Sequence, residues 1–523
     1  MPLRSLVPAV VAMAAMVLGA GPAAATPGPD PAPAPAPTSP AGDCAGLAEL
    51  ELAEVTAISA ELVTAGTSDD QTDLPAFCRV ALTVEPMVDI AVWLPVETYN
   101  GRFQAVGGGG YAGTISYPAM ATALRDGYAT ASTDTGHSTP GGSFALAAPG
   151  DLDEQLIEDF ASRSLFQLTE KAQTLVGAFY GMPAEYSYWN GCSTGGRQGL
   201  MLAQQLPDGY DGILAGAPAI NWDRFIPAEL WPQVVMQQEL GGPIAPCKLE
   251  AATRAVVAAC DTLDGVADGV LDDPRRCDFQ AASLVGQPTD CGEFTDVDAR
   301  VVQAIWDGAR TVDGTRLWYG LAPGAPLQGL AGPQPFPITV DHHRYWIEQD
   351  PNWDWQKLDY AGFEENFAAS QQLFNEVIGT DDPDLSAFRH SGGKVLIWHG
   401  WNDQLIFPEG TIDYYERVVD TVGNLHRAQD FARLFMAPGV EHCSGGAGAD
   451  QFDMFGELVA WVEDGAAPER ISAARVEDGQ QVLTRPLCLY PLVARYDGSG
   501  NPRVEASYDC KRTYGRWGTP GHG

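Results

Sequence analysis

Beyond its N-terminal segment the sequence lacks any long hydrophobic run, has few basic residues and shows no internal repeat. No later stretch reaches the ~18 uninterrupted apolar residues of a membrane-spanning helix, so an integral membrane protein is not expected. The 523 residues contain 30 Lys and Arg against 68 Asp and Glu, a formal net charge of −38. Since nucleic acids and anionic membranes repel such a surface, neither is an expected partner. The charge does not identify a substrate.

The one apolar run lies at the start of the chain. Residues 1–25 combine Arg4, an apolar run over 6–18 and three small residues at 23–25, the pattern of a cleavable secretory signal peptide. Residues 26–43 are rich in Pro, Ala and Thr, which predicts an extended or disordered linker. Ten cysteines in an exported chain favour disulfides over metal thiolates. We therefore expect a soluble, secreted protein with five disulfides.

Strand and helix patterns alternate through the first half of the remaining chain. Short apolar strand patterns occupy 102–106, 127–134 and 186–189. Helical spacing of apolar residues follows over 154–180 and again after Ser193. Such alternation predicts an α/β fold with a mainly parallel sheet.

The alternation stops after Ile220 and resumes near Lys394. The interval is rich in Gly, Pro, Trp and Cys, which suggests an insertion the size of a lid. We expect a catalytic domain formed by residues 44–220 and 385–523, with a lid domain over 221–384.

A candidate nucleophile lies in the segment 191–195, Gly-Cys-Ser-Thr-Gly, which is a G-x-S-x-G nucleophile elbow directly after a predicted strand. Asp403 and His442 each follow a later strand, in the chain order Ser, Asp, His that is typical of α/β-hydrolases. A serine hydroxyl becomes a good nucleophile when an imidazole takes its proton and a carboxylate orients that imidazole. Ser193, Asp403 and His442 are therefore the candidate catalytic triad. The alternatives are a structural histidine and an aspartate that caps a loop.

Two cysteines flank this triad. Cys192 directly precedes Ser193, and Cys443 directly follows His442. A disulfide requires Cα atoms about 4.4 to 6.8 Å apart, so this pair would hold the serine and the histidine side by side. No other histidine of the chain combines the expected order with such a cysteine, and we interpret the others as structural.

Acyl transfer also needs donors for the oxyanion. In this fold class one is the amide after the nucleophile, which here belongs to Thr194. The other is expected from the glycine loop 107–110, with Gly109 or Gly110 as the donor. The alternative for this loop is a plain glycine turn.

A candidate metal site lies in the segment 260–270. Asp261, Asp264 and Asp268 are closely spaced and separated by glycines that permit tight turns. Their carboxylates and the neighbouring carbonyls can surround one hard cation such as calcium. The spacing is not that of an EF-hand, and Asp-Gly pairs also occur in ordinary turns.

Together these motifs closely resemble the tannase and feruloyl esterase family, including its mono-hydroxyethyl terephthalate hydrolase branch. The resemblance spans the chain and is carried by the segments 102–110, 132–137, 191–199, 399–403 and 442–443. It implies an α/β-hydrolase core with a lid, and catalysis by Ser193, Asp403 and His442. It further implies a structural calcium in the lid, bound by Asp261, Asp264, Asp268 and the carbonyls of Val266 and Val270.

The resemblance also implies most of the disulfide pattern. The implied pairs are Cys192 with Cys443, Cys44 with Cys78, Cys260 with Cys277, and Cys488 with Cys510. Members of the family commonly have a nearby partner for the position of Cys291, but this chain has Gly286 in that vicinity and an additional Cys247. We therefore expect Cys247 to pair with Cys291.

The expected activity is hydrolysis of an aromatic acid ester, such as a ferulate or gallate ester of plant cell walls or tannins, through an acyl-enzyme. The nearest alternative is terephthalate monoester hydrolysis, which needs a lid group for the second carboxylate. A serine peptidase and a non-catalytic surface-binding protein are further alternatives. Candidates for the wall of the acyl pocket are the lid aromatics Trp318, Tyr319, Trp346, Trp353 and Trp355.

Overall fold

The structure, a computed structural model, describes residues 40 and 42–512. The expected signal peptide and nearly all of the expected linker lie outside the described residues. At the end of that linker, the amide of Gly42 donates a hydrogen bond of 2.9 Å to the carbonyl of Phe179. All described residues belong to one compact unit. In this part of the chain no helix is long and apolar enough to cross a lipid bilayer.

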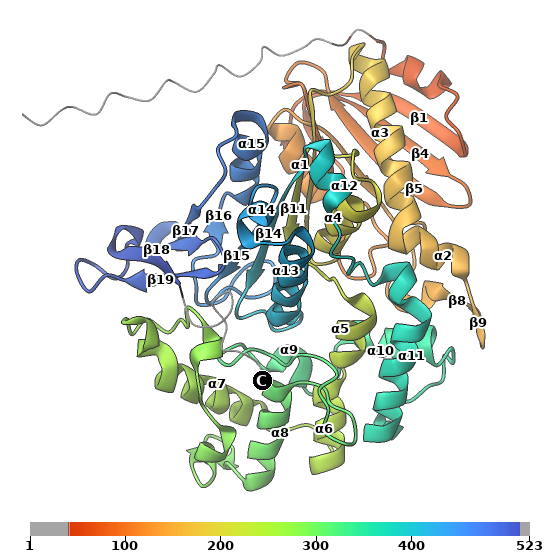
Figure 1. The fold of residues 1–523 in the computed structure, drawn as a ribbon. Helices are drawn as coiled ribbons and strands as arrows, with labels where there is room; N and C mark the ends of the chain where they lie inside the picture. Colours follow the sequence, from red (N-terminus) through yellow and green to blue (C-terminus); the bar gives the residue numbers. More distant parts are fainter. Residues whose placement is uncertain (1–39, 41, 513–523) are drawn as a thin grey trace, which may run out of the picture. The chain divides into compact units, whose positions relative to one another are not determined.

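The centre of the fold is a nine-stranded sheet with the strand order β1-β4-β5-β7-β6-β10-β11-β14-β15 (Figure 1). The pairs from β1 to β7 are antiparallel, and the five pairs from β7 to β15 are parallel. The strands are β1 (Val55–Val63), β4 (Phe77–Val84), β5 (Val88–Pro95), β6 (Arg102–Val106), β7 (Ala129–Thr133), β10 (Tyr186–Cys192), β11 (Gly212–Gly216), β14 (Lys394–Gly400) and β15 (Ala432–Ala437). The prediction of a mainly parallel α/β sheet is confirmed.

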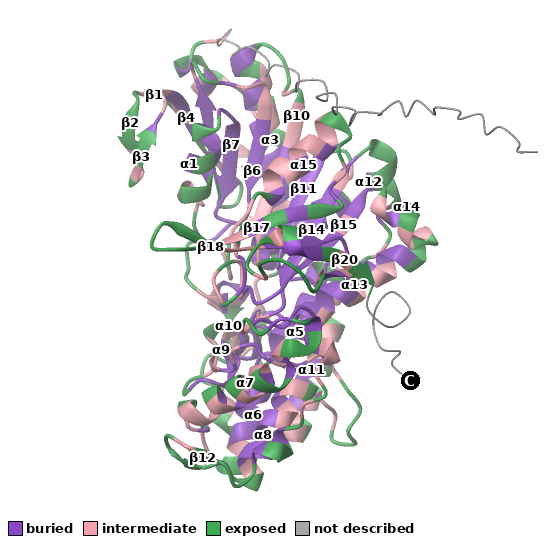
Figure 2. Cartoon of the chain, turned by 90° about the vertical axis from the view of Figure 1, so that its left-hand side faces the viewer, coloured by how far each residue is buried: buried purple, intermediate pink, exposed green. Residues whose placement is uncertain are grey.

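Helices cover both faces of this sheet, and the strand sequences show why. Successive side chains of a strand point to opposite faces of the sheet, and in the central strands the side chains on both faces are apolar. Trp189 and Ile213 pack in one core cluster with α3 and α4, whereas Tyr188 and Leu214 pack in another with α15. Figure 2 shows β11 as buried, whereas β10 is buried at its centre and partly buried toward its ends. The covering helices are α1 (Tyr117–Arg125), α3 (Ser164–Tyr180), α4 (Thr194–Gln205), α13 (Pro408–Val422) and α15 (Met454–Asp464).

The helix predicted over 154–180 is interrupted. It consists of α2 (Glu154–Glu158) and α3, joined by a π-helical turn over Asp159–Arg163. Arg197 of α4 donates hydrogen bonds to the carbonyls of Phe160 and Ala161 in this turn. The π-helical turn thus leaves two backbone carbonyls free to accept hydrogen bonds from the buried Arg197, four residues after Ser193.

Between β11 and β14, none of the described residues adds a strand to the main sheet. This segment is mostly helical. Its Trp231, Phe363 and Leu330 belong to a second hydrophobic cluster, which also includes Phe160 and Phe407 from outside the segment. Figure 1 shows its helices from α5 in yellow-green to α11 in teal. They are α5 (Trp222–Ala228), α6 (Trp231–Leu240), α7 (Pro246–Cys260), α8 (Asp296–Asp307), α9 (Gln328–Ala331), α10 (Pro337–Asp341), α11 (Tyr360–Ile378) and α12 (Ser386–Ser391).

The C-terminal region adds strands that the sequence patterns did not predict. Three form a small antiparallel sheet and two form a hairpin, and the Cys488–Cys510 disulfide joins the hairpin to that sheet. They are β16 (Gln451–Phe452), β17 (Arg470–Glu477), β18 (Gln480–Cys488), β19 (Leu492–Tyr496) and β20 (Tyr508–Arg512). These strands matter for the candidate metal site, because Arg485 of β18 forms ion pairs with Asp268 and Asp272 in the acidic loop after α7.

Candidate active site

Ser193 occupies a sharp turn between β10 and α4. Its φ of 63° and ψ of −126° lie in a region that L-residues rarely adopt. The flanking glycines make the turn possible: a Cβ on Gly191 would lie 2.5 Å from the carbonyl of Gly195. A Cβ on Gly107 would lie 2.4 Å from the Cα of Gly195, so the glycine loop packs directly on the elbow. The G-x-S-x-G spacing therefore follows from the close approach of these backbone segments.

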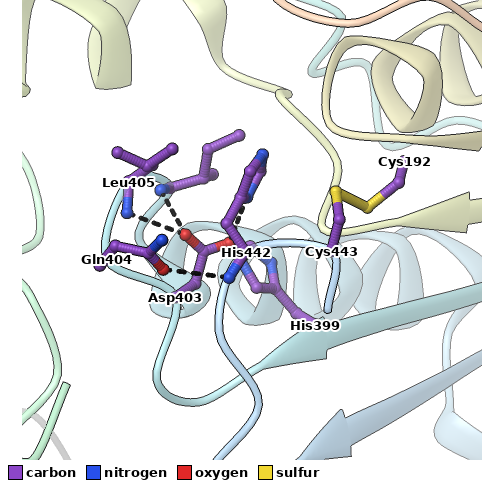
Figure 3. Close-up of a disulfide and its surroundings, with 8 residues drawn as sticks. Cys192, His399, Asp403, Gln404, Leu405, His442 and Cys443 are labelled. Carbon is purple, nitrogen blue, oxygen red and sulfur yellow. Dashed lines mark hydrogen bonds and ion pairs between the residues drawn. A yellow bond between two sulfur atoms is a disulfide. The ribbon is translucent and has the colours of Figure 1, made fainter. Parts of the chain in front are cut away.

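Asp403 lies in the loop after β14 and accepts four hydrogen bonds. His442 Nδ1 and His399 Nε2 lie 2.7 and 3.0 Å from its Oδ2. Its Oδ1 accepts the backbone amides of Leu405 and Ile406 at 2.9 and 2.8 Å. Burial by itself would raise the pKa of this carboxyl, but the charge of His442 and the hydrogen bonds from both histidines hold the pKa below its ordinary value. The side chain is thus a buried carboxylate that orients His442 (Figure 3).

His442 is held in place by its neighbours in the loop after β15. Its amide donates to Gln404 Oε1 at 3.1 Å. The next residue, Cys443, forms a disulfide with Cys192, with a Cα separation of 6.0 Å across 251 residues of sequence (Figure 3). Covalent linkage therefore ties the residue before Ser193 to the residue after His442.

The other four disulfides join the expected partners. Their Cα separations lie between 5.5 and 6.3 Å. The pairs are Cys44–Cys78, Cys247–Cys291, Cys260–Cys277 and Cys488–Cys510.

Ser193 and His442 border the same cavity. Among the described residues no hydrogen bond joins the Ser193 hydroxyl to His442, which is common in ligand-free sites that tighten only around substrate. The remaining wall is mostly apolar and comes largely from the helical insertion. The lining residues are Gly110, Ser193, Thr194, Ala219, Trp222, Phe225, Ile226, Glu229, Phe336, Ile338, Leu405, Ile406 and His442.

The cavity is small, with a volume of about 30 Å³. This is room for roughly two water molecules. An aromatic acyl group therefore enters only when parts of the wall move. Phe336 and Ile338 of the insertion belong to this wall, and Ile338 is the side chain that faces Gly110.

The glycine loop distinguishes between the two expected oxyanion donors. Gly107 and Gly108 already donate their amides to Asn190 O and Gln198 Oε1. Within the described residues, neither Gly109 nor Gly110 donates its amide to a protein acceptor. Gly110 borders the cavity, and its carbonyl accepts a 2.6 Å hydrogen bond from Thr194 Oγ1, whereas Gly109 is exposed and lies outside the cavity wall. The geometry thus favours Gly110 and Thr194 over Gly109.

Sequence reasoning missed three contributors to the site. His399, interpreted as structural, donates a hydrogen bond to Asp403 Oδ2, the same oxygen that accepts the hydrogen bond from His442. Gln404 fixes the amide of His442. Glu229 lies in the cavity wall, where no motif marks it. None of the five lid aromatics proposed for the wall borders the cavity; Trp222, Phe225 and Phe336 do so instead.

The acidic loop after α7 contains the expected calcium ligands. Asp261 Oδ1 accepts the amides of Asp268 and Gly269, and Asp264 Oδ1 accepts that of Val266. The other oxygen of Asp264 is buried without a hydrogen-bond donor. Arg485 pairs with Asp268 and with Asp272, whose second oxygen is likewise buried and unpartnered.

These observations test whether the loop suits a hard cation. Burial, with the charges of Asp268 and Asp261, raises the pKa of Asp264 to about 6. Unpartnered buried oxygens and a surplus of carboxylates over the single Arg485 fit calcium chemistry. However, in residues 40 and 42–512 no three His, Cys, Asp or Glu side chains are gathered as a ready metal group. The donor chemistry fits, and closing the site requires the carboxylates to move together.

Comparison with known proteins identifies the family to which this chain belongs. A model of the tannase and feruloyl esterase family matches residues 75–511. The chain belongs to this family. A protein of Arthroderma benhamiae named "Probable feruloyl esterase" is 41% identical over 464 residues, which cover 84% of this chain and 86% of that protein.

Solved structures agree with the family assignment. Feruloyl esterase B from Aspergillus oryzae matches with a TM-score of 0.79 and 28% identity, over 90% of this chain and 100% of that one. Tannin acyl hydrolase from Aspergillus niger matches with a TM-score of 0.77 and 25% identity, over 87% and 90%. The fold is an α/β-hydrolase, and the protein is a carboxylic ester hydrolase of the feruloyl esterase and tannase type.

Proposed function

We propose that this family member is a secreted serine esterase that hydrolyses esters of aromatic acids, such as feruloyl or galloyl esters, through an acyl-enzyme. The observation that carries the proposal is the cavity that Ser193 and His442 border together, with Asp403 2.7 Å from His442 Nδ1. An orienting carboxylate, a base and a strained serine are the parts that nucleophilic acyl transfer needs.

In the proposed reaction, His442 Nε2 takes the Ser193 proton as Oγ attacks the ester carbonyl. The amides of Thr194 and Gly110 stabilise the oxyanion. His442 then protonates the leaving alcohol, and the acyl group remains on Ser193. Water deprotonated by His442 attacks this acyl-enzyme, the acid is released, and the proton returns to Ser193. Asp403 keeps the Nδ1 proton in place and stabilises the imidazolium at each stage.

The cavity wall supports an uncharged aromatic acyl group. Trp222, Phe225 and Phe336 provide apolar surface, and none of the described residues that border the cavity is a Lys or Arg. A terephthalate monoester would bring a carboxylate that this wall does not neutralise, so that alternative is less well supported. Among known proteins, the similar chains named above are a feruloyl esterase and a tannin acyl hydrolase.

A plant cell-wall or tannin ester outside the cell is the proposed substrate source. Five disulfides favour an oxidising compartment. The net charge of −38 disfavours nucleic acid and anionic membranes as partners.

A hydrolysis panel tests the proposed substrate class. We expect the wild-type protein to release acid from methyl ferulate or methyl gallate with kcat/KM at least tenfold above that for hydroxyethyl terephthalate. Release of ferulate or gallate is followed by chromatography. Preferential terephthalate release would replace the substrate assignment, and cleavage of peptide amides alone would replace the ester assignment.

We also propose that the acidic loop binds a structural calcium through Asp261, Asp264 and Asp268, together with the carbonyls of Val266 and Val270. The supporting observation is the buried, unpartnered oxygen of Asp264. When bound, the cation neutralises carboxylates that Arg485 leaves uncompensated and holds the loop closed.

Chelation should lower stability before it lowers activity, because the loop is separate in sequence from every triad residue. At calcium concentrations 100-fold above Kd, binding to the folded state contributes about 2.7 kcal/mol. We expect the melting temperature to fall with chelator and to recover with calcium, and the Asp264→Asn variant to lose this response. An unchanged melting temperature, in protein that metal analysis finds free of calcium, contradicts the site.

A further inference from the structure

The cavity beside Ser193 contains an unexplained acid. Glu229 lies between α5 and α6, is 1% exposed and borders the cavity together with Ser193 and His442. Among the described residues that border the cavity, only His442 and Glu229 have ionisable side chains of the acid or histidine kind. Its neighbours in the wall include Trp222, Phe225 and Ile226, so this polar carboxyl lies in a mainly apolar environment.

The structure shows no hydrogen-bond partner for the Glu229 carboxyl among the residues it describes. Glu229 Oε2 is buried and makes no hydrogen bond with any described residue. A buried polar group without a partner costs roughly 1 to 3 kcal/mol, so natural structures seldom retain one without a use. A second such atom belongs to the same wall, since Trp222 Nε1 is also buried without an acceptor. The wall therefore offers a carboxyl and an indole N–H that no described protein group satisfies.

The protonation state decides which ligand group fits. Burial, reinforced by the negative charge of Asp403, raises the pKa of Glu229 well above its ordinary value. The carboxyl thus stays protonated at a pH where an exposed glutamate is ionised. A neutral carboxyl both donates and accepts a hydrogen bond. A phenolic hydroxyl has the same two capacities, whereas a methyl or unsubstituted ring position has neither.

We propose that Glu229 is a specificity-determining residue that hydrogen-bonds a hydroxyl substituent on the aromatic ring of the acyl group. The inference rests on the proposed function, because it requires the acyl group to be aromatic. Since the acyl group stays attached to Ser193 until deacylation, its ring lies against the wall that Ser193 and Glu229 share, once parts of that wall have moved to admit it. The ligand class is therefore a ring-hydroxylated aromatic acid, with hydroxycinnamoyl and hydroxybenzoyl groups as members.

Two methyl esters that differ only at the ring hydroxyl test the proposal: methyl 4-hydroxycinnamate and methyl cinnamate. The measured quantity is the ratio of their kcat/KM values, which does not depend on the fraction of folded enzyme. We expect Glu229→Leu to lower the ratio about tenfold, because one substrate hydrogen bond is lost. Glu229→Gln, which retains a donor and an acceptor, should keep the ratio within about threefold of wild type.

The outcomes separate this proposal from the proposed function. If wild type hydrolyses both esters and Glu229→Leu leaves the ratio unchanged, the role of Glu229 is wrong while the esterase assignment stands. If wild type hydrolyses neither ester, the proposed function fails and this inference falls with it. Should Glu229→Leu not fold, calorimetry on Ser193→Ala decides: 4-hydroxycinnamate should bind at least about tenfold more tightly than cinnamate, and equal affinities overturn the proposal.

Discussion

Replacing Ser193 by alanine should abolish ester hydrolysis while leaving the fold intact. In the proposed mechanism the hydroxyl oxygen forms the acyl-enzyme, and loss of a serine nucleophile lowers kcat roughly 10⁶-fold in a well-studied protease. The elbow should survive, because its shape depends on the close approach of Gly191, Gly195 and Gly107 rather than on the hydroxyl. Alanine also keeps the Cβ that serine places at φ 63°. Acid release and thermal melting measure the two effects.

Ser187→Ala is the matched control for this substitution. Ser187 lies on the same strand, β10, at the end away from the elbow. The control should keep wild-type turnover. More than about 1% residual activity in Ser193→Ala, after exclusion of wild-type contamination, would show that another group is the nucleophile.

Asp403→Asn is expected to lower kcat by a factor on the order of 10⁴. One oxygen of the buried carboxylate accepts hydrogen bonds from two histidines, and both hydrogen bonds favour its charged form. An asparagine side chain has two orientations here. Either its NH₂ group points at His442 Nδ1, or its carbonyl oxygen accepts the Nδ1–H hydrogen bond more weakly than the carboxylate does. If Nδ1 becomes the acceptor, the imidazole proton moves to Nε2, the atom that must take the serine proton. Turnover should therefore fall although the side-chain shape is unchanged.

Asp413→Asn on α13 makes the same chemical change away from the cavity. Asp413 is partly exposed and pairs with Arg417. Its variant should retain wild-type kcat within about twofold, since exposed ion pairs contribute little to stability. Near-normal turnover of Asp403→Asn would indicate that a different carboxylate orients His442.

Much of the site follows from local sequence. A serine between Gly191 and Gly195 at a strand end specifies the elbow, because few residues tolerate that backbone. Asp403 and His442 are recognisable because each directly follows a strand, and parallel strands bring their carboxyl ends to one edge of the sheet. Cys192 and Cys443 are adjacent to two of these residues, so their pairing follows from the same arrangement.

Other features depend on contacts between distant segments, and only the tertiary structure reveals them. Arg485 meets Asp268 across 217 residues, and nothing in either segment predicts the encounter. The preference for Gly110 over Gly109 as the proposed oxyanion donor depends on which of the two borders the cavity, since both are glycines in one loop.

The cavity wall shows the same division between sequence and structure. Composition predicts an aromatic insertion, yet Trp318 and Trp346 are buried away from the cavity while Phe336 and Trp222 border it. Glu229 has no motif, and its significance arises from burial beside Ser193. The chemistry of the triad is thus determined by short motifs at strand ends. The environment that selects a substrate is determined by long-range packing, because burial and the loss of solvent partners are properties of the assembled core.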